Sequence, residues 1–329
     1  MRLPIVCAPM FLVSGYELVI AQCTAGMVGA FPSLNARPES ELEVWLERIR
    51  EGLAEHDGKN PGAPAAPFAV NLIANKSNSR FDHDARVCVD AKVPLLLTSL
   101  HPPGDLVKEV HGYGGLVYHD VTTVRHAEKA IEQGVDGLVL VCAGAGGHAG
   151  TASPFAFLSE VRSFYDGTIV LAGAISTGAG LHAALSLGAD FVYMGSRFIA
   201  ARESNAPADY KQMVIDARLK DIVYTPYFSG LPANYLAQSI VGSGLDLDTV
   251  RSADPDRTRY QAGVKEKPKA WRDIRGSGQG IGLIEREQSV AEIADGLEAE
   301  WHEAERATQA RAAQRAGWLQ GRGAHGRTV

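Results

Sequence analysis

The chain has 329 residues, of which 46% are hydrophobic, and it carries a formal net charge of −6 at pH 7. This is enough apolar sequence to bury one large core, because single-domain α/β barrels often run beyond about 200 residues. Charges of both signs are spread along the chain without a basic stretch that interleaves aromatic residues, which argues against a nucleic-acid partner.

The four cysteines are widely spaced and form no CxxC motif, a usage typical of the reducing cytoplasm, where thiols stay unpaired. No metal site is expected, since the chain has neither an HExxH motif nor a Cys/His cluster. Residues 2–13 resemble a signal peptide only weakly, because Pro4 and Pro9 interrupt the apolar run, and a strand is predicted there instead. Because the chain has no apolar run of about 18 residues, the length needed to span a bilayer, we expect a cytoplasmic protein that does not bind a membrane.

Short apolar runs alternate with helical patterns along the first two thirds of the chain. Eight strands are predicted, at Leu3–Ala8, Met27–Phe31, Phe68–Leu72, Leu95–Thr98, Gly115–His119, Gly137–Val141, Ile169–Ala172 and Phe191–Met194. Runs that are apolar on both faces indicate a parallel sheet covered by helices. Eight of them with helical crossovers predict an α/β fold, the (β/α)8 TIM barrel. The alternative is an open doubly wound sheet, which the lack of a GxGxxG motif after the first strand disfavours.

The alternation of strands and helices stops after the eighth strand. Residues 207–289 contain prolines, aromatic residues and charges, and we interpret them as a mostly helical insertion, with loops, that lies over the barrel mouth. An amphipathic helix is predicted from Val290 to Gln309, and the tail from Ala310 to Val329 is expected to fray. The predicted domains are therefore the barrel (1–206), the lid (207–289) and the returning helix with its tail (290–329).

Two glycine-containing loops predict an anion site at the carboxyl ends of the strands, where barrel enzymes place their active sites. The seventh strand runs into LAGAIST (171–177) and the eighth into YMGSRF (193–198). Small residues before a helix expose backbone N–H groups that favour an anion, and these two loops are the usual phosphate site of barrels. We therefore predict phosphate binding here rather than two ordinary glycine turns.

The sixth strand ends in AGAGGHAG (143–150), whose small residues let the backbone approach a flat ligand closely. His148 would then stand at the barrel mouth, and its imidazole suits proton transfer because its ordinary pKa lies near neutrality. We favour this role over a loop histidine bonded to a neighbouring carbonyl. Asn71, at the end of the third strand, either pairs its amide with a heterocycle edge or forms an Asx turn.

Several short motifs occur in order over nearly the whole chain. They are APM (8–10), VNL (70–72), GGHAG (146–150), GAI (173–175), GADFVYMGSRF (188–198) and a tryptophan followed by GSGQG (276–280). In this combination they resemble the nitronate monooxygenase family, formerly called 2-nitropropane dioxygenases. The same motifs look like flavin-type enoyl-ACP reductases and NADH:quinone reductases, so they indicate the family more firmly than the substrate.

The resemblance implies an FMN-dependent enzyme in which His148 is the catalytic base on the substrate side. It also implies four groups of cofactor-binding residues. The phosphate would be held by Gly173, Ala174, Gly195 and Ser196, and the isoalloxazine ring would lie beside Met10, Asn71 and Gly147. Gln279 and Gly280 would close over the cofactor, and the remaining residues belong to the same loops and strand ends: Ala8, Pro9, Asp120, Ala145, Gly146, Ala172 and Met194.

The chain departs from the family pattern at two places. Many relatives carry a lysine where this chain has Asp120, and a positive group there would stabilise anionic reduced flavin whereas a carboxylate would not. The segment TPYFSGLPANYL (225–236) also lacks the arginines common in relatives. Both departures concern the substrate and the reduced cofactor rather than the fold.

The expected reaction is oxidation of an alkyl nitronate, or of a nitroalkane deprotonated by His148, with O2 to a carbonyl compound and nitrite. An NAD(P)H-dependent reductase of quinones or enoyl thioesters is the alternative among flavoenzymes. A lyase or isomerase that binds a phosphorylated substrate is the alternative from a different class. The expected partners are the small substrate and O2, and a homodimer stays open.

Overall fold

A computed structural model of the protein describes residues 1–75, 78–253 and 268–324, with side chains up to residue 315. Its main sheet consists of eight parallel strands in the order β1-β9-β8-β6-β5-β4-β3-β2. Their bounds are β1 Ile5–Cys7, β2 Gly29–Pro32, β3 Phe68–Ala74, β4 Leu95–Leu100, β5 Leu116–Val121, β6 Gly137–Val141, β8 Thr168–Ala172 and β9 Phe191–Met194.

Backbone hydrogen bonds beside β1 and β2 join the two edges of this sheet. Cys7 N donates to Val28 O at 2.8 Å, and Val28 N donates to Ile5 O at 3.0 Å. Each of the eight predicted strands overlaps an observed one, and the closed ring confirms the predicted (β/α)8 barrel. The open doubly wound sheet is therefore excluded.

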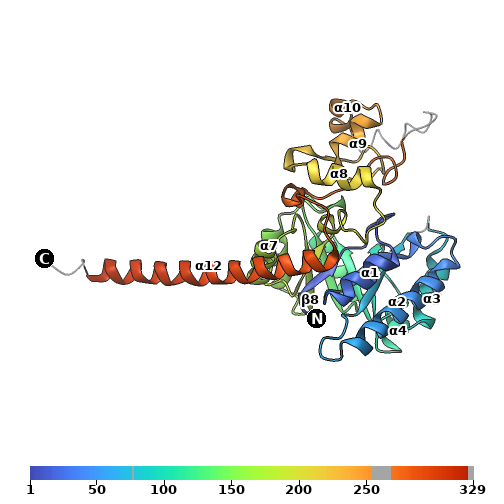
Figure 1. Ribbon diagram of the computed structural model, residues 1–329, viewed down its shortest axis with the longest axis horizontal. Coiled ribbons are helices and arrows are strands. Elements are labelled where there is room, and N and C mark those ends of the chain that lie inside the picture. The colour runs from blue at the N-terminus through green and yellow to red at the C-terminus, as the bar shows by residue number, and fades with distance from the viewer. Residues whose placement is uncertain (76–77, 254–267, 325–329) are drawn as a thin grey trace.

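Helices cover the outside of the barrel (Figure 1). Apolar side chains pack on both faces of its sheet. Along β6, Leu138 and Leu140 pack outward against the helices, whereas Val139 and Val141 point into the barrel interior. This alternation follows the two-residue period of a strand. The outer helices that follow the first seven barrel strands are α1 Tyr16–Thr24, α2 Glu41–Lys59, α3 Phe81–Asp90, α4 Leu106–His111, α5 Val124–Glu132, α6 Pro154–Arg162 and α7 Gly178–Leu187, and a short 3-10 helix, η1 Ser33–Asn35, precedes α2.

The eighth outer position is taken by α12, Val290–Ala324, which packs beside α7 and α1. Val290, Ile293 and Leu297 are buried against the barrel, and the rest of the helix projects away from it (Figure 1). The predicted end at Gln309 is wrong, because the helix continues to Ala324 instead of fraying. Alanine, glutamine and arginine are strong helix formers, so this tail has a high intrinsic helix propensity. Residues 325–329 of the predicted tail lie outside the described residues.

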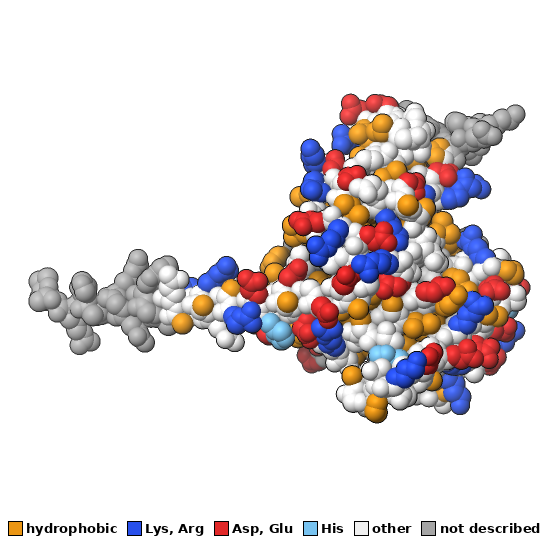
Figure 2. All heavy atoms as spheres, in the orientation of Figure 1, with side chains coloured by type: hydrophobic (Ala, Val, Ile, Leu, Met, Phe, Trp, Pro, Cys, Tyr) orange, Lys and Arg blue, Asp and Glu red, His pale blue; other side chains and the backbone are white. Residues whose placement is uncertain are grey.

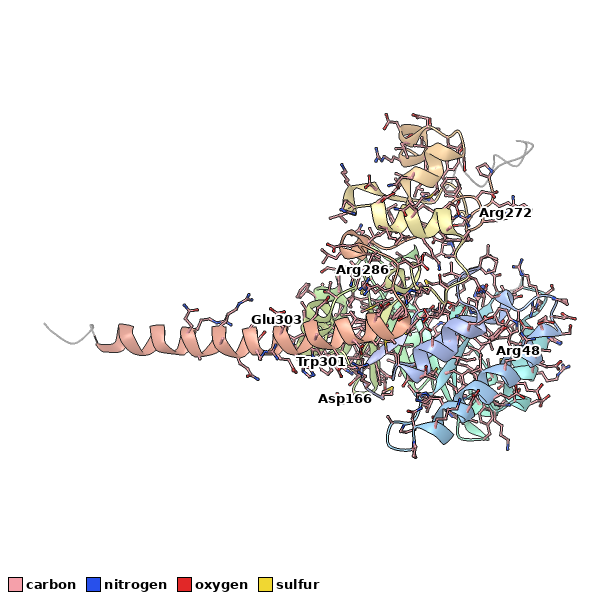
Figure 3. All side chains as sticks on the ribbon, viewed as in Figure 1. Arg48, Asp166, Arg272, Arg286, Trp301 and Glu303 are labelled. Atoms are coloured by element: carbon pink, nitrogen blue, oxygen red, sulfur yellow. The ribbon has the colours of Figure 1, made fainter. Side chains whose placement is uncertain are left out.

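Close contact between α7 and α12 depends on a glycine at the start of α7. Gly178 N donates to Glu300 Oε2 at 2.7 Å, and a β-carbon at Gly178 would overlap the Leu297 carbonyl oxygen and the Trp301 backbone nitrogen. Trp301 lies on the part of α12 that runs beside the barrel (Figure 3). The two backbones can therefore meet only where no side chain stands between them.

We expect Gly178→Ala to lower the free energy of unfolding by about 1–3 kcal/mol, because overpacking forces two rigid backbones apart. Gly296→Ala is the matched control on α12, since a β-carbon there has no heavy atom within 4 Å. This second substitution should stabilise the protein by about 0.5–1 kcal/mol through helix propensity. Urea unfolding measures both changes, and a neutral Gly178→Ala would contradict the tight contact.

The insertion after β9 lies over one end of the barrel (Figure 1). Its described elements are α8 Ala208–Asp216, β10 Ile222–Thr225, β11 Ala233–Leu236, α9 Ala237–Gly242 and α10 Leu247–Arg251, with the 3-10 helices η2 Ser196–Phe198, η3 Leu219–Asp221 and η4 Gln279–Leu283. The antiparallel pair β10–β11 was not predicted, because Pro226, Gly230 and Pro232 gave this segment the composition of a loop. β11 also pairs with β7, Gly147–His148, which attaches the insertion to the loop after β6.

On the face shown in Figure 2, acidic and basic side chains are interspersed over both the barrel and the insertion. Among the described residues, no helix combines the length and the apolar character that crossing a bilayer requires.

Candidate active site

The loops after β8 and β9 lie next to each other because these two strands are paired, with Ala172 opposite Tyr193. Gly173 and Ala174 both adopt left-handed backbone conformations, with φ of +134° and +57°, which is uncommon for alanine and marks a locally strained turn. The N–H groups of Gly173, Ala174 and Gly195 donate to no backbone carbonyl among the described residues. These donors are therefore available to an anion at the barrel mouth.

The helical ends behind the two loops differ. α7 follows the first loop and is capped by Thr177, whose hydroxyl accepts from Gly180 N at 3.0 Å. The second loop leads only into η2, a single 3-10 turn, and not into a longer helix as we expected. The favourable dipole of a helix N-terminus therefore comes from α7 alone.

The glycine-rich segment of the insertion packs directly on the barrel loops. Gly278 N donates to Ser196 Oγ at 2.8 Å, and Gln279 N donates to Gly144 O at 2.8 Å. Ser176 Oγ donates to Gly280 O at 2.5 Å. The predicted closing residues Gln279 and Gly280 thus lie against the loops after β6 and β8.

Glycines are needed in this part of the site because the chains approach so closely. A β-carbon at Gly146 would lie 2.9 Å from Gly278 N, and one at Gly280 would lie 2.6 Å from Ala174 O. Real β-carbons essentially never come so near to backbone atoms, so side chains are excluded at both positions. The predicted phosphate and closing residues form one cradle of backbone groups.

The loop after β1 forms the next wall of the mouth. Ala8 N donates to Met194 O at 2.9 Å, and the Met10 sulfur would lie 3.7 Å from a β-carbon at Gly195. Ala8, Pro9 and Met10 are half-buried. The structure therefore brings the predicted APM segment beside the predicted phosphate loops.

A buried chain of hydrogen bonds crosses three neighbouring strands just below the mouth. Asn71 Nδ2 donates to Leu97 O at 3.0 Å and to Ser99 Oγ at 2.9 Å, and Ser99 Oγ donates to Asp120 Oδ2 at 2.7 Å. Burial raises the pKa of Asp120 to about 6, and the Ser99 hydrogen bond opposes this shift. Both Asn71 N–H groups are used within the protein, so only the amide oxygen is left to face a ligand.

His148 lies in β7 at the solvent-exposed rim of the mouth, where Trp271 packs edge-on against its ring at a centroid distance of 5.3 Å. Trp271 in turn packs against Tyr235 at 5.0 Å and has a positive φ of 71°, so it is held in a strained conformation. Partial burial of the ring lowers the pKa of His148 through desolvation. This shift favours the neutral imidazole, which is the form that can act as a base.

Hydrogen bonds to Ser229 assign the tautomer of this imidazole. Ser229 Oγ donates its single proton to Leu231 O at 3.0 Å, because a carbonyl oxygen can only accept. The contact of 2.9 Å between His148 Nε2 and Ser229 Oγ must then be donated by the histidine. Nε2 carries the proton, and Nδ1 is the nitrogen that can take up another.

Sequence reasoning missed several residues of the site. Ser99, Tyr193, Ser229, Asn234 and Trp271 all contribute polar or aromatic groups near the predicted residues; for instance, Asn234 Nδ2 donates to Ala145 O at 2.7 Å. The only available signals were the two-residue alternation that aligns Ser99 and Tyr193 with the barrel interior, and the tryptophan before the GSGQG motif.

Comparison with known proteins places this geometry in a family. The family model described as nitronate monooxygenase matches residues 54–300. The chain is 26% identical over 291 residues to a nitronate monooxygenase of Paraburkholderia phytofirmans, covering 77% of each protein.

Two further similarities are to proteins that carry other names. A (3aS,4S,5R,7aS)-5-hydroxy-7a-methyl-1-oxo-octahydro-1H-indene-4-carboxyl-CoA dehydrogenase of Rhodococcus jostii is 28% identical over 240 residues, which cover 73% of this chain but only 64% of the longer relative. The structure of a point mutant of FabK from Thermotoga maritima has a TM-score of 0.74 at 25% identity, with 94% of this chain and 96% of that chain covered. Because the family model matches most of the chain, the protein belongs to the nitronate monooxygenase family of oxidoreductases.

Proposed function

We propose that the protein is an FMN-dependent oxidoreductase that oxidises alkyl nitronates or nitroalkanes with O2 to a carbonyl compound and nitrite. The observation that carries this proposal is the imidazole of His148, which lies at the rim of a mouth lined by backbone N–H donors. Family membership supports the reaction class, and the similarity to the nitronate monooxygenase of Paraburkholderia phytofirmans supports the substrate class.

The residues present fit FMN. The N–H groups of Gly173, Ala174, Gly195 and Ser196 would hold the phosphate, because neutral donors beside the N-terminus of α7 bind a dianion without an arginine. Met10, Asn71 and Gly147 would border the ring, and Gln279 and Gly280 would cover the cofactor. When bound, the flavin supplies the two-electron acceptor that the side chains of the protein lack.

His148 would accept the proton from the carbon next to the nitro group at Nδ1, since Ser229 keeps Nε2 protonated. Trp271 limits rotation of the imidazole by packing edge-on against it. A nitronate has already lost this proton, so for that substrate the histidine would serve to orient the nitro group by hydrogen bonding.

Oxidation of a neutral nitroalkane should depend on pH through His148. Only the unprotonated imidazole can accept a proton, and its lowered pKa means that this form is reached below the ordinary value of 6.5. We therefore expect kcat/KM to rise with pH in the acidic range and to level off at a lower pH than an unperturbed imidazole would give. Initial rates with freshly dissolved nitroalkane measure this profile. A rate that instead falls as the imidazole deprotonates would assign His148 the role of an acid.

The second candidate is an NAD(P)H-dependent reductase of quinones or enoyl thioesters, which the similarity to FabK and to the CoA-linked dehydrogenase favours. Anaerobic mixing of the purified protein with a nitronate and, separately, with NADH or NADPH distinguishes the two. The reductant that bleaches the flavin absorbance identifies the reaction. A colourless protein that takes up no flavin would contradict both candidates and favour a lyase or isomerase with a phosphorylated substrate.

A further inference from the structure

A carboxylic acid buried within the barrel mouth is not used by the chemistry proposed above. Asp120 lies two residues after Tyr118 on β5, so its side chain points to the barrel interior as that of Tyr118 does. Its Oδ2 accepts from Ser99 at 2.7 Å, whereas its buried Oδ1 has no hydrogen-bond partner among the described residues. A buried polar atom left unpaired in this way is uncommon and calls for an explanation.

We propose that Asp120 takes up a proton at Oδ1 when the bound flavin is reduced, and thereby offsets the negative charge that reduction adds to the barrel mouth. This inference rests on the proposed flavin function. It gives this carboxylate a role of its own, because a protonated carboxyl group removes the repulsion that an ionised one would exert on the reduced ring.

The direction of the hydrogen-bond chain determines which oxygen receives the proton. Asn71 donates one N–H group to Leu97 O and the other to Ser99 Oγ. Ser99 therefore accepts from Asn71 and has its single hydroxyl proton directed at Asp120 Oδ2. Because Oδ2 already accepts this hydrogen bond, an added proton goes to Oδ1.

The groups around Asp120 provide no positive charge, within the described part of the chain, that would keep it ionised. Ser99 on β4 and Val139 on β6 flank it, and Tyr193 on β9 faces it with a buried hydroxyl that has no partner among the described residues. The preceding residue His119 is turned away and bonds to Thr98 Oγ1 through Nδ1 at 2.8 Å. Burial alone already brings the pKa of Asp120 to about 6, close enough to neutrality that one added negative charge decides its protonation.

Electrostatics predicts the sign of the coupling. A negative charge that arises nearby in a water-poor site favours the neutral carboxyl form, so reduction raises the pKa of Asp120 further. By linkage, protonation of Asp120 favours the reduced flavin by the same free energy. Two electrons pass from the reductant to the flavin, one additional proton passes from solvent to Oδ1, and no bond within the protein breaks.

The test is the reduction potential of the bound flavin between pH 5 and pH 9 in the wild type and in Asp120→Asn, titrated with dithionite. Above pH 6 the wild type should take up one more proton per two electrons than the variant. This corresponds to a slope steeper by about 30 mV per pH unit. Below pH 6 the two slopes should converge, because the carboxyl group is then protonated before reduction. Tyr193→Phe is the matched control, since it removes the unpaired hydroxyl oxygen that faces Asp120 while keeping Asp120 itself, and it should retain the wild-type slope.

A measurement on the unmodified protein covers the case in which Asp120→Asn loses flavin or stability. Reduction of the wild type at pH 7.5 should produce a protonated-carboxyl C=O band in the infrared difference spectrum. Equal slopes for the wild type and the variant, or no such band in the wild type, would overturn this inference. The proposed function would still stand in that case if the protein is yellow and its flavin can be reduced. A protein that binds no flavin at all would overturn both.

Discussion

Replacing His148 with alanine is expected to lower the turnover of a neutral nitroalkane by about 10²- to 10⁴-fold, the usual contribution of a general base. The flavin should stay bound, because His148 lies at the rim and is not part of the backbone cradle formed around Gly173 and Ser196. A preformed nitronate needs no deprotonation, so the same variant should lose less activity with that substrate. The ratio of the two losses is therefore the informative quantity.

This comparison requires equal flavin occupancy, since a disturbed loop that releases cofactor would imitate lost chemistry. His182→Ala is the control, because His182 is a half-buried histidine that also bonds to a hydroxyl, that of Thr308, at 3.0 Å, but it lies on α7 outside the proposed site. Equal losses with nitroalkane and nitronate would show that His148 orients the nitro group rather than accepting a proton. Unchanged activity with both substrates would place the base elsewhere.

The barrel could be predicted from the sequence because its signals are local. Gly134-Val135-Asp136 before LVLV, and Gly188-Ala189-Asp190 before FVYM, each mark a helix end, a tight turn and a strand buried on both faces. Each strand then pairs with neighbours of the same kind, so local pattern and overall topology agree. The β10–β11 hairpin gave no such signal, because both strands are short and prolines lie between them. Its pairing with β7 through β11 depends on the fold of the loop after β6.

The candidate site likewise contains residues that could be predicted from the sequence and residues that could not. Residues in glycine-rich loops at strand ends could be predicted, since backbone flexibility at a strand end has few other uses. Ser229 could not, because it reaches His148 from a position 81 residues further along the chain. Trp271 was noticed as part of a motif, but its contact with His148 depends on how a separate loop folds. Asp120 was predicted as a cofactor-binding residue and noticed as a departure from the family. Its unpaired Oδ1 depends on the three-dimensional neighbourhood that β4 and β9 provide.

Gly195→Val is expected to abolish flavin binding and to yield a colourless, folded protein. A β-carbon at this position would already lie 3.2 Å from the Ala8 β-carbon and 3.7 Å from the Met10 sulfur, so the two methyl groups of valine must extend into the space in front of the phosphate donors. Those donors are backbone N–H groups, which bind a phosphate only if its oxygens come within about 3 Å. Even a small obstruction therefore removes several hydrogen bonds at once.

The effect of Gly195→Val must be separated from simple unfolding. Gly58→Val is the matched control, because Gly58 lies on α2 far from the strand ends and a β-carbon there meets no atom within 4 Å. Circular dichroism and the urea midpoint should be similar for the two variants, whereas flavin absorbance per protein should be normal only in the control. Full occupancy in a folded Gly195→Val protein would move the phosphate away from the loops after β8 and β9. The free N–H groups of Gly173 and Ala174 would then need another ligand to explain their strained conformation.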